Sequence, residues 1–593
     1  MERTRNRGNH SADPAQPGKQ SRTGGLRKQT DTNKGRSREM DDLPSSADLI
    51  VLGTGLGESI VAAACSRIGK SVLHFDNRSH YGAHFAAFSF NDLNEALDNQ
   101  ANATKETDNS VPLDRSIPKG QHFVPARQVP LFSNVCVELR IPEGCGWTED
   151  CLRKDSRKFN LDLAPRLLFA RGKMVELLIS SNIAKYAEFK LVSRVLTLKN
   201  GTLEQVPCSR ADVFATKSVN VVEKRALMKL MTAIQDFEKQ EIFADWLDKP
   251  FSNFLEQKEL HLTDNLRHFI VNSIAMCDES TRTSLALANA KKFLQSLGRY
   301  GNSPFLCPIY GCGELPQCFC RLCAVFGGIY HLERKTDGFL VNNNDNRIVG
   351  VISQGKTFTA SHVIANLDTS PQPMAESIEY VSRGIVIACE SMLPLEKEQI
   401  TLLRVPPEGT RQAVTVIEQG PGMMVCPKGL VVAHLSCRKG ELATAQEDLK
   451  PVVDQLYPYD KQVWVAYFNT PDTASKAYSI SGDIHNLFTM ASPGLHLDYD
   501  FHIDQAQHVF YSMFPEEKFL PRAPDPEEII LDFEEPSAKP ATGGVEQSTA
   551  QCLDAPVSNL NLESQPGKDQ QDEALNCATN IREDVEQNET GMN

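Results

Sequence analysis

The chain has 593 residues, of which 41% are hydrophobic, and it carries a net charge of −14. It is longer than one ordinary domain, so two folded domains with tails are expected, and the negative charge argues against a nucleic-acid binder. Its sixteen cysteines form no paired framework and no signal peptide precedes them, which is typical of reduced thiols in a cytosolic protein. The most apolar stretches, such as 60–65, are too short to span a bilayer.

Both ends of the chain are predicted to be disordered, because neither holds enough large apolar residues to form a core. Residues 1–46 are a basic extension rich in Arg, Lys, Ser, Gly and Asn. A transit peptide is the less favoured alternative, since the segment lacks an amphipathic apolar face, and Met40 is a plausible alternative start. Residues 533–593 form an acidic tail, whose last residues hold no prenylation motif.

The most informative stretch, 48–76, has the pattern strand, glycine turn, helix, strand. Residues 48–52 are apolar and β-branched, which indicates a buried parallel strand. Gly53, Gly55 and Gly57 allow a tight turn with close backbone approach, and a helix is expected from about 58 to 67. A second strand at 72–75 ends before Asp76. This pattern predicts the βαβ unit of an α/β, flavoprotein-like fold of the FAD/NAD(P)-binding type.

One residue of this unit argues against a bound dinucleotide. The fingerprint G-x-G-x-x-G uses its third glycine for close helix–strand packing and leaves the helix N-terminus free for a pyrophosphate. Glu58 occupies the third position, where its carboxylate would compete with a phosphate for the same N–H groups. Asp76 stands where a ribose-binding acid would be expected. We therefore expect the fold of a flavoprotein without FAD or any other cofactor.

The next part of the chain alternates between irregular and periodic segments. Residues 91–157 contain clusters of Asn, Asp, Pro and Lys, which predict an irregular insert. A helical period follows over 167–180. A strand is then expected over 189–198, with a hairpin turn at Gly201.

A helical domain over 210–298 is predicted by amphipathic segments at 224–237, 266–276 and 285–297. The simplest interpretation inserts it into a discontinuous sheet domain made of 47–90, 158–209 and 299–532. Further strands of that domain are expected near 329–332, 339–342, 348–352, 362–365, 385–388, 414–417, 429–435 and 463–468. Two further helices are expected at about 445–455 and 504–513.

The segment 299–332 carries a second informative helix. Gly311 and Gly313 form a turn, Pro316 fits the first turn of a helix, and the helix is expected to end at about 326. One side of the helix is an apolar stripe predicted to be buried, made of Leu315, Phe319, Leu322 and Phe326. A polar face is made of Glu314, Gln317 and Arg321. Spacing alone favours a solvated face over a binding face.

Cysteines at 307, 312, 318, 320 and 323 raise the possibility of a zinc site, which their spacing disfavours. Cys318 and Cys320 would point to different sides of one helix, and no C-x-x-C pairs or histidine pair complete a tetrahedral site. His80 and His331 are lone histidines and are predicted to be structural. The sequence holds no nucleophile elbow, metalloprotease or Walker motif, so neither a catalytic constellation nor a metal is expected.

Three long motifs resemble the family of Rab GDP-dissociation inhibitors and Rab escort proteins. They are D-L-I-V-L-G-T-G-L-G-E-S-I at 48–60, V-L-H-F-D-N-R-S-H-Y-G at 72–82, and the run from R-Y-G-N-S-P-F to G-E-L-P-Q-C-F-C-R at 299–321. The resemblance covers about 43–532 without the insert, and implies a two-domain flavoprotein-like fold that binds no FAD. Three further motifs and the insert are closer to the escort proteins: Y-A-E-F-K at 186–190, E-Q-V-P-C-S-R-A-D-V-F at 204–214 and V-E-K-R at 222–225.

The resemblance implies a non-catalytic accessory subunit, component A, of Rab geranylgeranyltransferase in the cytosol. Such a protein binds newly made, GDP-bound Rab GTPases and presents their C-terminal cysteines to the catalytic α/β heterodimer. It then holds the geranylgeranylated Rab in solution and delivers it by transient membrane contact. Each methylene of the lipid that leaves water contributes about 0.8 kcal/mol, so the carrier needs an apolar groove, for which the helical domain is the expected place.

By motif, the resemblance implies a Rab-binding platform made of Tyr81, Arg299, Glu314, Arg321 and Tyr330. It also matches Phe214 and Arg225 to the pair through which escort proteins dock on the transferase α subunit. An aromatic residue beside an arginine is typical of an interface hot spot, although Phe214 by itself could equally be a core residue. Two positions depart from the family pattern. Asn77 replaces an arginine of the inhibitors, and Ala83 replaces a frequent second glycine.

Two rival functions remain open at this point. A Rab GDP-dissociation inhibitor would recycle Rabs without docking on the transferase, and Phe214, Arg225 and the insert argue against it. An FAD-dependent oxidoreductase is less favoured because of Glu58. A flavin absorbance band in the purified protein would identify the oxidoreductase.

Overall fold

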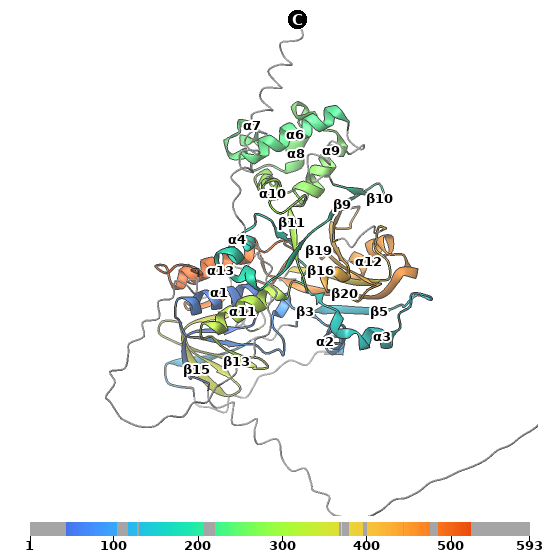
Figure 1. The fold of residues 1–593 in the computed structure, drawn as a ribbon. Coiled ribbons are helices and arrows are strands. Elements are labelled where there is room, and N and C mark those ends of the chain that lie inside the picture. Colours follow the sequence, from blue (N-terminus) through green and yellow to red (C-terminus); the bar gives the residue numbers. More distant parts are fainter. Residues whose placement is uncertain are drawn as a thin grey trace, which may run out of the picture. The chain divides into compact units, whose positions relative to one another are not determined.

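The βαβ unit predicted over 48–76 is present in the computed structural model (Figure 1). It comprises β1 (Ser46–Leu52), α1 (Leu56–Arg67) and β2 (Val72–Phe75), so the helix begins two residues earlier than expected. All described residues belong to one compact unit, 1–524. The structure describes residues 43–102, 117–126, 130–206, 220–366, 369, 379–394, 400–442, 444–474 and 484–522.

The βαβ unit lies within a sheet of eight strands in the order β12–β2–β1–β15–β14–β13–β4, with β21 pairing to β15. The part around β1 is parallel and also contains β15 (Lys356–Ala365), β12 (Ile329–His331) and β21 (Leu487–Thr489). An antiparallel extension contains β14 (Ile348–Ser353), β13 (Thr336–Asn342) and β4 (Gln121–Pro125). The long strand β15 joins the two parts, because its first residues pair with β14 and its later ones with β1.

Helices cover one face of the parallel part of this sheet (Figure 1). They are α1, α11 (Glu314–Val325) and α13 (Asp500–Met513), and α1 contacts both of the others. Residues 56–66 of α1 are all buried, because the helix lies between the sheet and its two neighbours. Phe75 on the other face packs in a separate cluster with Phe339 and Phe358. The packing therefore sets α11 directly against the helix that follows the glycine turn.

A second eight-stranded sheet has the order β10–β9–β17–β18–β19–β16–β20–β5. Its strands are β5 (Ser133–Leu139), β9 (Arg194–Lys199), β10 (Thr202–Gln205), β16 (Glu379–Ala388), β17 (Thr401–Val405), β18 (Val414–Gln419), β19 (Val431–Arg438) and β20 (Gln462–Asp472). The helix α12 (Ala445–Leu456) packs on β16, β19 and β20. It begins with a capping box, in which Thr444 and Glu447 satisfy each other's backbone N–H groups.

Two small sheets hold the segment that leads into α11. One contains β7 (Leu168–Phe169), β11 (Phe305–Pro308) and β8 (Phe189–Leu191), and the other contains β3 (Ala87–Phe88) and β6 (Leu161–Asp162). The helix α4 (Lys173–Ser180) follows β7. Because β6 also lies against the turn that precedes α11, distant segments meet at the N-terminus of that helix.

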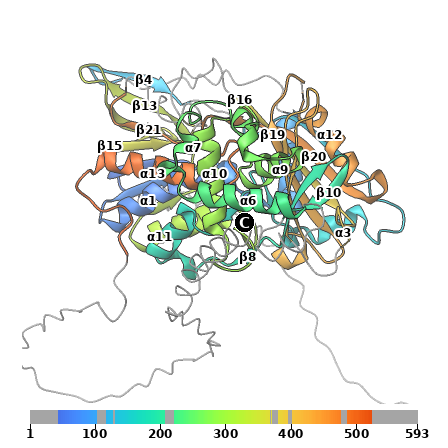
Figure 2. The ribbon, with the colours of Figure 1, turned by 90° about the horizontal axis from the view of Figure 1, so that it is seen from above.

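Helices make up the described part, 220–298, of the segment 210–298 that was predicted to be helical (Figures 1 and 2). It contains α6 (Val221–Gln235), α7 (Glu241–Ala244), α8 (Phe251–Leu255), α9 (Asp264–Phe269), a π-helical turn (Ile270–Ile274) and α10 (Thr283–Ser296). Asn220 and Glu223 form a capping box at the start of α6. The buried residues of these helices share one hydrophobic cluster with the second sheet, and the division into a sheet domain and a helical domain remains a prediction.

The prediction of irregular structure over 91–157 is wrong for the described residues. This stretch contains most of α2 (Phe90–Asn102), all of β4 and β5, and α3 (Glu149–Lys154). Phe90, Leu93 and Leu97 form a buried stripe at helical spacing that polar neighbours obscure in the sequence. β4 and β5 lie at the edges of the two large sheets, and none of their side chains is fully buried, so neither strand has a pronounced apolar face in the sequence.

Three other expectations need correction. The helix expected over 167–180 is β7 followed by the shorter α4, and the strand expected over 189–198 divides into β8 and β9 in different sheets. The strands β11, β17 and β21 were not predicted at all. Short apolar runs do not distinguish strand from helix by periodicity, which explains these errors.

Phe326, placed in the buried stripe of α11, is 39% exposed beneath the guanidinium of Arg67.

Candidate functional site

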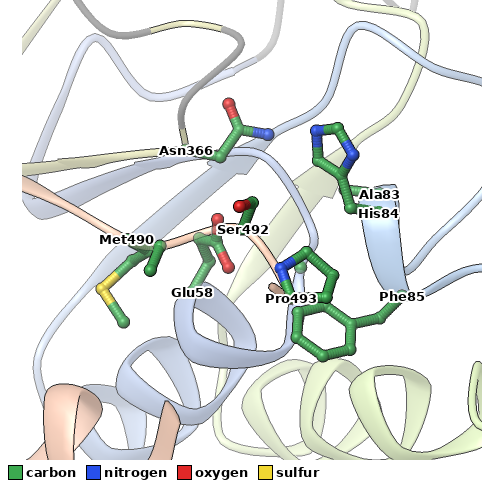
Figure 3. Close-up of a pocket in the computed structure, with 10 residues that line it drawn as sticks. Glu58, Ala83, His84, Phe85, Asn366, Met490, Ser492 and Pro493 are labelled. Carbon is green, nitrogen blue, oxygen red and sulfur yellow. The ribbon is translucent and has the colours of Figure 1, made fainter. Parts of the chain in front are cut away.

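The glycine turn after β1 is covered by side chains of the chain itself. A methyl group built on Gly55 would lie 2.5 Å from the Glu58 carboxylate, and methyl groups on Gly53 and Gly57 would collide with Asn366 and Met490. Figure 3 shows these three side chains around the remaining cavity, whose volume of about 10 Å³ holds one water molecule at most. The residues at this turn do not fit the pyrophosphate of a dinucleotide.

Asp76, which stands where a ribose-binding acid would be expected, accepts hydrogen bonds from the residues around the turn. Its Oδ2 accepts from the backbone N–H of Thr54 at 2.8 Å and from the Thr54 hydroxyl at 2.7 Å. Its Oδ1 accepts from the backbone N–H of Arg78 at 2.9 Å. With the side chain buried, both oxygens stabilise the loop rather than face a ligand. The filled turn and the occupied carboxylate support the expectation drawn from Glu58.

The N-terminus of α11 is held by a carboxylate from another element. Its N-cap residue, Gly313, has no side chain to accept a backbone hydrogen bond. Asp162 of β6 supplies the acceptor, since the N–H of Cys312 donates to its Oδ1 at 2.7 Å. A carboxylate at this end of a helix also interacts favourably with the helix dipole. Burial raises the pKa of Asp162 to about 7, despite the backbone hydrogen bonds that favour its ionised form.

The polar face predicted for α11 is present. Gln317 and Arg321 are exposed and Glu314 is half-buried, which raises the pKa of the Glu314 carboxyl. The Arg321 guanidinium lies over the ring of Tyr186, 4.9 Å from its centroid. The opposite side of the helix buries Leu315, Phe319 and Leu322 against α1. Arg321 is therefore available at the surface of a helix whose other side is fixed.

Tyr81 and Tyr330 lie together, but the hydroxyl of Tyr330 is buried. Their ring centroids are 6.0 Å apart, and Tyr330 also stacks on His74 of β2 at 4.5 Å. The Tyr330 hydroxyl faces Cys320 and Cys323 of α11, and burial raises its pKa. Tyr330 can support the surface beneath Tyr81, whereas its neighbour Ile329 is exposed.

Arg299 contacts a different part of the structure from the other platform candidates. Its guanidinium donates to the carbonyl of Ala170 at 2.8 Å and forms an ion pair with Glu176 of α4. It also lies over the ring of Tyr300. The structure thus brings Tyr81 and Tyr330 together and places Glu314 and Arg321 on one helix. It associates Arg299 with α4 and with Ala170, the residue that follows β7.

The other predicted site is only partly described. Arg225 is exposed on α6, beside the exposed Val221 and Val222 at helical spacing. Phe214 lies outside the described residues.

Ala83, which replaces a frequent family glycine, adopts a positive φ of 47°, a conformation that favours glycine.

The cysteines near α11 are buried and point in different directions. Cys318 donates to the carbonyl of Tyr186, whereas Cys320 lies 3.1 Å from the hydroxyl of Ser59 on α1. Burial raises the pKa of Cys318 to about 11 and that of Cys320 to about 12, which is typical of unreactive structural thiols. Among the described residues, no group of three or more Cys, His, Asp and Glu side chains could hold a metal ion.

Sequence comparison identifies the relatives of this chain. The family model for "GDP dissociation inhibitor" matches residues 40–116 and 148–481, which is more than half of the chain. This chain belongs to the GDP dissociation inhibitor family. The "Rab proteins geranylgeranyltransferase component A" of Drosophila melanogaster is 40% identical over 513 residues, which cover 84% of this chain and 94% of that protein. Component A 1 of Homo sapiens is 34% identical over 620 residues, covering 83% and 94% respectively.

Structural comparison supports the same fold. The crystal structure of the Rab GDI from Plasmodium falciparum matches with a TM-score of 0.58 at 18% identity, covering 80% of this chain and 100% of that chain. At this identity the match concerns the fold alone. The predicted family and the flavoprotein-like fold class are therefore confirmed for this GDP dissociation inhibitor family member. Every helix in its described ranges is too short or too polar to span a bilayer.

The sequence did not predict two residues that the structure joins to α11, Asp162 and Tyr186. Asp162 stands within the apolar run L-D-L at 161–163, and a lone carboxylate in such a run is a signal for a buried acceptor. Tyr186 opens the motif at 186–190, but nothing in that motif indicates a contact with α11. Its position over Arg321 depends on the pairing of segments that lie far apart in the chain.

Proposed function

We propose that this chain is a Rab escort protein, the non-catalytic component A of Rab geranylgeranyltransferase. It binds GDP-bound Rab GTPases, presents them to the catalytic α/β heterodimer for C-terminal geranylgeranylation, and carries the lipidated Rab through the cytosol to a membrane. The observation that carries this proposal is the 40% identity with a protein named as component A over 94% of that protein's length.

The geometry supports a binding protein rather than a redox enzyme. The glycine turn is filled by Glu58, Asn366 and Met490, and Asp76 is engaged by the loop. The polar face of α11, in contrast, leaves Arg321 at the surface. In this proposal, Tyr81, Glu314 and Arg321 contact the Rab, Tyr330 supports them, and Arg299 extends the surface near α4. Phe214 and Arg225 dock on the transferase.

The geranylgeranyl chain needs an apolar groove in the escort protein. A cavity of about 290 Å³ in the helical region is lined by charged and polar side chains, including Glu256, Asp264 and Arg267. Burial of an apolar chain against such groups is unfavourable. This cavity therefore does not fit the geranylgeranyl chain.

The deciding experiment is geranylgeranyl transfer to a purified GDP-bound Rab by the catalytic heterodimer, with and without this protein. We expect transfer to depend on its addition. A Rab that is prenylated equally well without it would contradict the escort function. A reaction without the Rab is the matched control, since it reports any geranylgeranyl transfer to the proposed escort protein itself.

A Rab GDP-dissociation inhibitor is the second candidate, because the matching family model carries that description. Such a protein would bind Rab but would not bind the transferase. A pull-down with the purified heterodimer separates the two functions. Retention of the heterodimer supports the escort protein, and Rab binding without retention supports the inhibitor.

A further inference from the structure

Tyr186 is the first residue of the motif at 186–190, and none of the roles above involves its side chain. It ends the short 3-10 turn Ile183–Lys185, and 53% of its surface is exposed. Its backbone is held on both sides. Its N–H donates to the carbonyl of Ile183 at 2.8 Å, and its carbonyl accepts from the Cys318 thiol at 3.9 Å. Because Cys318 lies on α11, this hydrogen bond links Tyr186 to that helix.

The ring of Tyr186 lies beneath Arg321, one turn beyond Cys318 on the same helix. The guanidinium carbon is 4.9 Å from the ring centroid, within the range of a cation–π interaction. Within the described part of the chain, Arg321 has no carboxylate partner. A guanidinium that stacks by its face keeps the N–H groups at its edge available for a partner. An unsupported arginine would lose many rotamers on binding, and that entropy loss weakens an interface.

We propose that Tyr186 is a positioning residue, which holds the Arg321 guanidinium at the surface in the orientation that the Rab GTPase binds. This inference rests on the proposed function and deepens it, since it adds a residue outside α11 to the predicted platform. Because the ring is exposed, its removal leaves no buried cavity, so a change in Rab affinity can be separated from a loss of stability.

The test is the dissociation constant for a fluorescently labelled, GDP-bound Rab, measured by titration with four variants. These are Tyr186→Ala, Tyr186→Phe, Arg321→Ala and the double variant Tyr186→Ala/Arg321→Ala. We expect Tyr186→Ala to weaken binding about threefold to fivefold, and Tyr186→Phe to bind as the wild type does, because phenylalanine keeps the ring. In the Arg321→Ala background, Tyr186→Ala should have no further effect.

Two results would overturn the positioning role while leaving the proposed function intact. One is an unchanged affinity of Tyr186→Ala, and the other is a full additional loss in the Arg321→Ala background, which would indicate a direct contact of Tyr186 with the Rab. A wild-type protein that binds no Rab would overturn the proposed function itself, and the positioning role with it. Equal unfolding midpoints of all variants exclude a structural cause.

Discussion

Replacement of Asp162 by asparagine tests how the N-terminus of α11 is held. The Asp162 carboxyl is buried, and burial raises its pKa from 3.8 to about 7 on folding. A group whose pKa is raised on folding stabilises the fold in its protonated form. This stabilisation is complete below about pH 4 and is lost as the pH rises through about 7. Asparagine cannot ionise, yet its amide oxygen can still accept from the N–H of Cys312.

The expected magnitude follows from the two pKa values. Each pH unit between them corresponds to about 1.4 kcal/mol, so the wild type loses about 4 kcal/mol of stability when Asp162 ionises completely. About 2.5 kcal/mol of this loss falls between pH 5 and pH 8. The stability of Asp162→Asn relative to the wild type should therefore increase by about that amount over this range, with the variant the more stable protein at pH 8.

Urea unfolding at several pH values between 5 and 8 measures this difference directly. Asp248→Asn is the matched control, because it makes the same change from carboxylate to amide at an exposed position. Stability curves of the wild type and Asp162→Asn that run parallel across the range would refute the reasoning. They would mean that Asp162 is already ionised in the folded protein at pH 5.

Three further predictions follow from the candidate sites. Arg321→Ala should weaken Rab binding about tenfold in a titration and leave the unfolding free energy within about 0.5 kcal/mol of wild type, because the side chain is exposed; a large loss of stability would indicate a structural role. Phe214→Ala should weaken transferase binding by about 2 kcal/mol or more by calorimetry, and unchanged affinity would remove Phe214 from that interface. Glu58→Gly restores the glycine fingerprint but should acquire no flavin absorbance with added FAD, since Asn366 and Met490 still cover the turn; a flavin band would contradict this.

Local sequence patterns were sufficient to predict the βαβ unit and the faces of α11. The glycines at 53, 55 and 57 and the apolar runs around them require no information from the rest of the chain. Glu58 was also visible as a local exception. In contrast, Asn366 and Met490 fill the same turn from positions more than 300 residues away. Only the order of strands in the first sheet brings them there.

The supporting position of Tyr330 could have been predicted from the sequence. Side chains alternate between the two faces of a strand, so Tyr330 on β12 must point away from the face of Ile329 and His331. In the structure its hydroxyl is buried against α11 and Ile329 is exposed. For 329–331, this alternation predicts a supporting role for Tyr330 and places its two neighbours on the opposite face of the strand.

The filled glycine turn and the predicted Rab-binding surface are parts of one structure. The helix α1, which would offer its N-terminus to a phosphate in a dinucleotide-binding protein, here packs along α11, and Ser59 of α1 contacts Cys320 of α11. β2 of the same unit supplies His74, on which Tyr330 stacks beneath Tyr81. Glu58 closes the turn, and the βαβ unit becomes a rigid support for the proposed binding surface on α11 and β12. A surface placed on fixed elements needs little reordering when a partner binds, which favours affinity.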